Sequence, residues 1–90
     1  MPAPRITVYT RDNCPYCVRA KRLLDKKGFS FEEVNVGDDD TRRLWLVEKS
    51  GQQTLPQIFA GERSLGGFSD LEALDRDGRL DPLLRGEGGG

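Results

Sequence analysis

The two cysteines of the chain, Cys14 and Cys17, are separated by two residues and are the side chains best suited to chemistry. A pair with this spacing can form a structural disulfide, contribute to a metal site or act as a redox pair. A disulfide that closes so short a loop restricts the unfolded chain little, so a structural role is the weaker interpretation. The chain has no histidine, and two cysteines alone cannot complete a tetrahedral zinc site without carboxylates or a second subunit. We therefore favour the redox pair.

The residues around this pair predict that Cys14 lies at the N-terminus of a helix. Residues 5–10 (RITVYT) favour a strand, and Pro15 suits the first turn of a helix. Apolar residues then recur with helical spacing up to Gly28, which ends the helix. The free N–H groups and the dipole at a helix N-terminus stabilise a thiolate, which is the form of cysteine that attacks disulfides. We predict that Cys14 is the nucleophile and that Cys17, one turn further in, is the resolving thiol.

The segments that follow predict an α/β fold around this strand and helix. The predicted elements are strands at 29–36, 55–60 and 63–65, a hairpin turn at 61–62, a helix that begins within 38–41 and ends at Gly51, a helix that Ser69 and Glu72 cap and Gly78 ends, and a short last turn after Asp81. The order β-α-β-α-β-β-α predicts a parallel first unit and an antiparallel hairpin. Together they predict a four-stranded mixed sheet flanked by helices.

Length, charge and hydropathy limit the classes of function. Ninety residues predict a single domain, which we place at 1–84, followed by a flexible glycine-rich tail at 85–90. A net charge of −1 gives no long-range attraction to nucleic acid or to an anionic membrane. No apolar run reaches the roughly 18 residues of a membrane span, and the first residues lack the apolar stretch of a signal peptide. We therefore expect a cytoplasmic protein that binds neither nucleic acid nor membranes.

Three stretches and the order of elements together resemble the dithiol glutaredoxins. The stretches are YTRDNCPYC (9–17), GQQTLPQIF (51–59) and GGFSDL (66–71). The resemblance covers about residues 5–84 and implies a thioredoxin-like fold. It also implies a glutathione-dependent thiol–disulfide oxidoreductase that reduces protein–glutathione mixed disulfides and protein disulfides. Glutathione would then be the cosubstrate, glutathione reductase an indirect partner and the protein a monomer with no tightly bound cofactor.

The same resemblance implies where glutathione would bind. Arg11 and Gln52 match positions near its glycine carboxylate, although lysine is commoner than arginine at the first. Tyr16 would form a wall of the groove. Leu55 would offer its backbone N–H and C=O to an extended substrate beside a cis Pro56. The γ-glutamyl end would lie at the start of the third helix, against Gly67, Phe68, Ser69 and Asp70.

Two alternatives remain open. One is a module that binds a [2Fe–2S] cluster through Cys14 and glutathione from two subunits. Family members of that kind mostly carry Cys-Gly-Phe-Ser, so Pro15 and Tyr16 argue against it. The other is a hydrogen donor for ribonucleotide reductase that thioredoxin reductase reduces. That family usually carries a Ser-Gly-Phe-Arg-Pro-Asp segment where this chain has GGFSDL (66–71).

Overall fold

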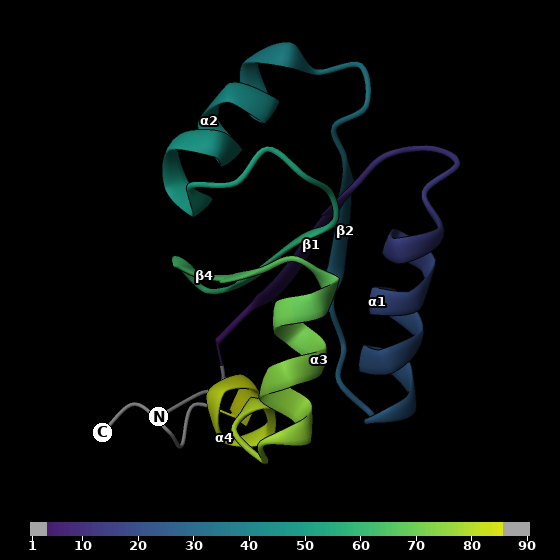
Figure 1. Cartoon of the computed structure of the whole chain (residues 1–90), viewed down its shortest axis with the longest axis vertical. Helices are drawn as coiled ribbons and strands as arrows, with labels where there is room; N and C mark the ends of the chain where they lie inside the picture. Colours follow the sequence, from purple (N-terminus) through teal and green to yellow (C-terminus); the bar gives the residue numbers. More distant parts are fainter. Residues whose placement is uncertain (1–3, 86–90) are drawn as a thin grey trace.

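In the computed structural model, which describes residues 4–85, a mixed four-stranded sheet is covered by helices on both faces (Figure 1). In chain order the elements are β1 (Ile6–Thr10), α1 (Pro15–Lys26), β2 (Glu32–Asn35), α2 (Asp40–Ser50), β3 (Gln57–Ala60), β4 (Arg63–Gly66), α3 (Phe68–Arg76) and α4 (Leu80–Arg85). The strands lie in the order β2-β1-β3-β4. β1 is parallel to β2 and antiparallel to β3, and β3 is antiparallel to β4. The predicted α/β architecture is confirmed.

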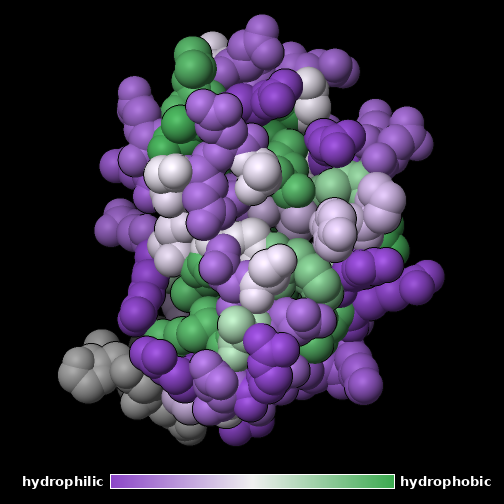
Figure 2. Space-filling view, in the orientation of Figure 1, coloured by the Kyte–Doolittle hydropathy of each residue, from purple (hydrophilic) through white to green (hydrophobic). Residues whose placement is uncertain are grey.

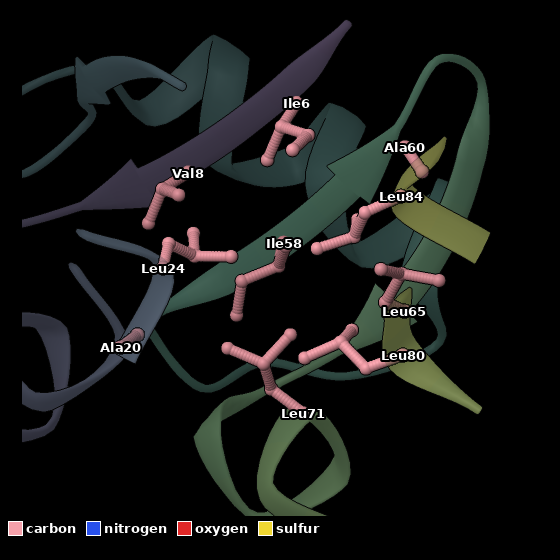
Figure 3. Close-up of a cluster of buried hydrophobic side chains, with 10 residues drawn as sticks. All are labelled: Ile6, Val8, Ala20, Leu24, Ile58, Ala60, Leu65, Leu71, Leu80 and Leu84. Atoms are coloured by element: carbon pink, nitrogen blue, oxygen red, sulfur yellow. The ribbon is translucent and has the colours of Figure 1, made fainter. Parts of the chain in front are cut away.

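The larger core cluster fills the space between one face of the sheet and α1, α3 and α4. Figure 3 shows its ten buried side chains, which are Ile6, Val8, Ala20, Leu24, Ile58, Ala60, Leu65, Leu71, Leu80 and Leu84. Ile58 of β3 lies at the centre, with Leu24 of α1 and Leu71 of α3 pointing toward it. Each fully buried side chain of this size contributes about 1.5–3 kcal/mol to the stability of the fold. This packing therefore holds α1 and α3 in fixed positions on β3.

An aromatic cluster on the other face holds α2. Successive strand residues point to opposite faces, so Tyr9 and Phe59 face α2 while their neighbours face the larger core. The ring of Trp45 stacks on Phe59 with centroids 5.8 Å apart, and Tyr9 meets Phe59 edge-on at 5.5 Å. The carboxylate of Asp39 accepts a hydrogen bond from the Arg42 N–H (2.9 Å) and caps the helix. Aromatic packing and capping together fix the position of α2.

The start of α3 differs from the sequence-based prediction. The helix begins at Phe68 with Gly67 as its N-cap, so Ser69 lies in the first turn and the predicted Ser69–Glu72 capping box is wrong. The carboxylate of Asp70 instead accepts a hydrogen bond from the Gly67 N–H (3.0 Å). The N-cap is therefore two residues earlier than predicted, and the helix starts two residues earlier.

Other boundaries shift by a few residues. β2 begins only at Glu32, because Phe29 and Phe31 pack against the larger core cluster before the strand starts. The last element is a helix that begins at Leu80, so Asp81 lies inside it rather than before it. Arg85 is the final residue of α4, and the remainder of the predicted tail lies outside the described residues. Within residues 4–85, no helix combines the length and the apolar character needed to span a membrane.

Candidate active site

Three loops meet at one edge of the sheet, and each brings residues that the sequence singles out. β1 and β3 are antiparallel, with Tyr9 opposite Gln57, so the segment after β1 lies beside the segment before β3. The end of β4 lies at the same edge, because Gly66 is opposite Ile58. The cysteines, the Leu55–Pro56 peptide and the start of α3 are therefore neighbours in space although they are distant in the chain.

Cys14 is the N-cap of α1, as the sequence predicts. Its backbone is extended (φ −114°, ψ 100°), and Pro15 follows in the first helical turn. The backbone N–H of Cys17 donates a hydrogen bond to the Cys14 sulfur (3.2 Å). An N–H that points at the sulfur stabilises its thiolate form, because the negative charge accepts a stronger hydrogen bond than the thiol does. Cys14 thus lies where a helix end can support an attacking thiolate.

Both cysteines are buried, since Cys14 is 5% exposed and Cys17 is 2% exposed, but the environment of Cys17 favours the thiol. Burial and, to a smaller extent, the hydrogen bond with Cys14 together raise the pKa of Cys17 to about 11. A hydrogen bond with the backbone of Arg11 lowers that pKa in part. Both cysteines are free in this structure. The two sulfurs are therefore unequal, since the Cys14 sulfur accepts a backbone N–H hydrogen bond and the Cys17 sulfur keeps its proton at neutral pH.

The peptide that precedes β3 lies against the nucleophile. The Leu55–Pro56 bond is cis, as the family resemblance implies. The carbonyl oxygen of Leu55 is 3.8 Å from the Cys14 sulfur, within reach of a weak S–H···O hydrogen bond. The backbone of Leu55 is therefore adjacent to any disulfide that reacts with Cys14.

The turn from β4 into α3 comes close to the same peptide. A Cβ atom on Gly67 would lie 3.3 Å from the carbonyl oxygen of Pro56, so glycine allows this close approach. Gly66 has φ +90° and faces the Asp70 carboxylate, where a side chain would collide. That carboxylate accepts hydrogen bonds from the Gly67 N–H (3.0 Å) and from the Gln52 amide (3.4 Å). The start of α3 is thus tied to the segment before β3.

The remaining predicted residues border this arrangement. Tyr16 is 54% exposed, and its ring centroid lies 6.0 Å from that of Phe68, so the two rings form one wall beside Cys14. The guanidinium of Arg19 lies 5.2 Å above the Tyr16 ring, a contact that sequence patterns do not identify. Arg11 is exposed and lines a depression that both cysteines also line.

Gln57 is a site residue that the sequence analysis missed. Its side chain is fully buried, and its amide N–H groups donate to the Gln52 side-chain oxygen (2.9 Å) and to the Thr54 carbonyl (2.8 Å). It therefore holds the segment that leads to Leu55. The signal in the sequence is a lone amide at the start of an otherwise apolar strand, QIFA (57–60). Among residues 4–85, no three metal-ligating side chains gather into a group that could hold an ion.

Comparison with known proteins agrees with this geometry. The glutaredoxin family model matches residues 6–65. Glutaredoxin 3 of Escherichia coli strain K12 is 46% identical over 80 residues, which cover 89% of this chain and 96% of that protein. A Pseudomonas aeruginosa glutaredoxin is 47% identical over 81 residues, covering 90% of this chain and 96% of the relative.

Solved structures agree as well. The buckwheat glutaredoxin–glutathione complex superimposes with a TM-score of 0.87 at 30% identity, covering 94% of this chain and 80% of that one. Glutaredoxin from Brucella melitensis gives a TM-score of 0.85 at 42% identity, covering 100% of this chain and 96% of the other. The chain therefore belongs to the glutaredoxin family and is a glutathione-dependent thiol oxidoreductase.

Proposed function

We propose that the protein uses Cys14 alone to reduce protein–glutathione mixed disulfides and uses Cys14 together with Cys17 to reduce protein disulfides. The inequality of the two sulfurs carries this proposal. The Cys14 sulfur accepts an N–H hydrogen bond at the helix start and lies beside Leu55. Cys17 is buried with a raised pKa, so it enters the reaction only after Cys14 has formed a mixed disulfide.

The first reaction needs one cysteine. The Cys14 thiolate attacks the glutathione sulfur of a mixed disulfide, the disulfide bond breaks, and the protein sulfur leaves as a thiolate that takes a proton from water. A second glutathione thiolate then attacks the Cys14–glutathione disulfide and releases glutathione disulfide. In the net reaction the second glutathione thiol is oxidised and the protein sulfur is reduced to a thiol, while the first glutathione sulfur passes from the mixed disulfide into glutathione disulfide.

The second reaction needs both cysteines. Cys14 attacks one sulfur of a protein disulfide and becomes linked to it, while the other sulfur leaves as a thiol. Cys17 then loses its proton and attacks the Cys14 sulfur, which frees the protein and leaves a Cys14–Cys17 disulfide. Two glutathione molecules reduce that disulfide and are themselves oxidised. The spacing supports this step, since the side chains of Cys14 and Cys17 are within hydrogen-bond reach of each other.

The proposed glutathione site runs across the three loops. The backbone N–H and C=O of Leu55 form hydrogen bonds with the cysteinyl part of glutathione, and Tyr16 forms a side wall. At the start of α3, the Leu71 N–H donates to the Gly67 carbonyl (3.0 Å), so the N–H groups before it stay outside the helical pattern. Those N–H groups, with Ser69, suit the γ-glutamyl carboxylate, while Asp70 suits its ammonium. The buckwheat relative was solved in complex with glutathione, which supports glutathione as the ligand.

Arg11 and Gln52 complete the proposed site at the glycine end of glutathione. Arg11 supplies a positive charge on the rim of the depression that the cysteines line. Gln57 holds the side-chain oxygen of Gln52, and the Gln52 amide N–H would leave Asp70 to reach the glycine carboxylate. The reaction consumes reduced glutathione, which glutathione reductase regenerates from NADPH. Because reduced glutathione is abundant only in a reducing compartment, we propose that the protein acts in the cytoplasm. We also propose that it acts as a monomer.

The test is NADPH consumption with a small glutathione mixed disulfide, glutathione and glutathione reductase. The parent protein and Cys17→Ser should turn over this substrate, and Cys14→Ser should not. With a protein disulfide as substrate, both variants should be inactive. Turnover by thioredoxin reductase without glutathione would contradict the proposal. A brown protein after anaerobic purification, with no thiol–disulfide activity, would instead support the [2Fe–2S] alternative.

A further inference from the structure

A groove separates α2 from the segment that leads into β3. Its volume is about 400 Å³. The residues that line it are Asp40, Arg43, Leu44, Leu46, Val47, Gln52, Gln53, Thr54 and Leu55. Four of them recur on α2 at helical spacing (40, 43, 44 and 47), so one face of the helix forms one wall. The aliphatic side chains from α2 and Leu55 give the groove an apolar interior.

Leu44 is the most exposed large hydrophobic residue among those described, with 67% of its side chain accessible. Figure 2 shows hydrophobic side chains at the surface over α2, at the upper left. A single exposed leucine is common in proteins and requires no explanation by itself. Here, however, Leu44 borders a groove that Leu46, Val47 and Leu55 continue inward. The exposed surface of Leu44 is therefore part of a larger apolar surface and is not an isolated patch.

The groove is continuous with the active site through Leu55. This residue lines the groove, and its carbonyl oxygen is 3.8 Å from the Cys14 sulfur. A polypeptide in extended conformation rises about 3.3 Å per residue, so the side chain two positions from a reacting cysteine lies about 7 Å away. Glutathione has one residue on each side of its cysteine and ends before that distance. A protein substrate continues past it.

The charges in the groove limit what it can accept. Asp40 and Arg43 carry opposite charges on the α2 wall, and the facing wall is made of the uncharged residues 52–55. The groove thus gives no net electrostatic preference for a charged side chain. An uncharged aliphatic side chain gains from contact with Leu44 and Val47 and leaves no charge without a partner.

From this geometry we infer that the groove between α2 and residues 52–55 binds the polypeptide of a protein disulfide substrate and takes an aliphatic side chain close to its reacting cysteine. The inference rests on the proposed function, because the substrate chain must first place its sulfur at Cys14. The groove shares Gln52 and Leu55 with the proposed glutathione site, and its α2 wall, with Leu44 and Val47, adds a determinant of substrate choice beyond them.

The test compares two peptides that each contain one intramolecular disulfide. One carries leucine two positions before and two positions after a cysteine, and the other carries serine at both positions. We expect the parent protein to reduce the leucine peptide with a kcat/KM about fivefold higher, as partial burial of an aliphatic side chain would give. Leu44→Ser should remove this preference. Glu48→Ser, which changes another exposed residue of α2 that does not line the groove, should retain it.

A small glutathione mixed disulfide is assayed in parallel to separate the possible failures. If the parent protein fails to reduce it, the proposed function is wrong and the groove assignment falls with it. If it is reduced normally but the two peptides react equally, only the groove assignment is overturned. A Leu44→Ser variant that loses the same factor on all three substrates would also overturn it. Because Leu44 is largely exposed, the melting temperature of the variant should stay within a few degrees of the parent's.

Discussion

The raised pKa of Cys17 gives a quantitative prediction for cysteine alkylation. Burial raises this pKa from its ordinary value of 9.0 to about 11. At pH 8, a thiol with a pKa of 9.0 is roughly 10% thiolate, and one with a pKa of 11 is roughly 0.1%, a difference of about 100-fold. Iodoacetamide reacts with the thiolate, so Cys17 in the folded, reduced protein should be alkylated at least about 100 times more slowly than in the unfolded protein.

The assay quenches aliquots over time and measures the modification of each cysteine by peptide mass spectrometry. The protein in guanidinium chloride at the same pH provides the unfolded reference. Cys14 should be modified first in the folded protein, because its sulfur lies at the helix start with an N–H donor. Equal rates for Cys17 in the folded and unfolded protein would refute the argument from burial.

The same shift makes the stability of the reduced protein depend on pH. Because folding raises the pKa of Cys17, the unfolded chain loses this proton first as pH rises. The contribution of the buried thiol is complete below pH 9 and is lost between about pH 9 and 11. A pKa difference of two units between the folded and unfolded protein changes the free energy of unfolding by about 3 kcal/mol at most. Cys17→Ser does not titrate in this range, so the parent should lose more stability than the variant in urea unfolding between these pH values.

Three further predictions concern other parts of the molecule. Asp70→Ala should raise the KM for glutathione several-fold and reduce stability by about 1 kcal/mol through loss of the Gly67 cap. Asp70→Asn keeps an acceptor for the cap, so in urea unfolding it should recover the stability while KM stays high; recovery of both would contradict the role of the charge. Leu71→Ala empties a fully buried position and should cost about 2–5 kcal/mol by urea unfolding, and a loss below 1 kcal/mol would contradict the packing. Hydrogen bonds from Lys21 and Thr10 lower the pKa of Glu33, so Glu33 stabilises the fold above its ordinary pKa of 4.5 and this contribution disappears as pH falls below that value. Acid unfolding of Glu33→Gln should therefore show a weaker pH dependence, and an unchanged profile would contradict this assignment.

Local sequence signals predicted the cysteine helix correctly because the whole signal lies within a few residues. Pro15 favours the first turn, Gly28 favours the end, and the strand before them is rich in β-favouring residues. The start of α3 was predicted wrongly because two overlapping local patterns are both possible there. The pair Ser69 and Glu72 matches the sequence pattern of a capping box, but in the structure the Asp70 carboxylate bonds to the Gly67 N–H instead. Gly67 also approaches Pro56 closely, and local patterns cannot reveal a contact between segments far apart in the chain.

Features that depend on several elements could not be predicted from local patterns. Gln57 orders the segment before β3 through bonds to Gln52 and Thr54, which requires knowing that its side chain is buried. The groove beside α2 likewise lies between a helix that packs on the sheet through Trp45 and a segment that follows that helix, so it depends on tertiary packing. The sequence predicted where α2 begins and ends but not which of its faces would remain open.

The most direct test of the central claim is to trap the intermediate on Cys14. Reduced Cys17→Ser and Cys14→Ser proteins are each treated with glutathione disulfide at pH 7, and their intact masses are measured. We predict that Cys17→Ser gains one glutathione on Cys14, which excess glutathione then removes, and that folded Cys14→Ser remains unmodified. Rapid glutathionylation of Cys17 in Cys14→Ser, with an unmodified Cys14 in the other variant, would contradict the assignment of nucleophile and resolving thiol.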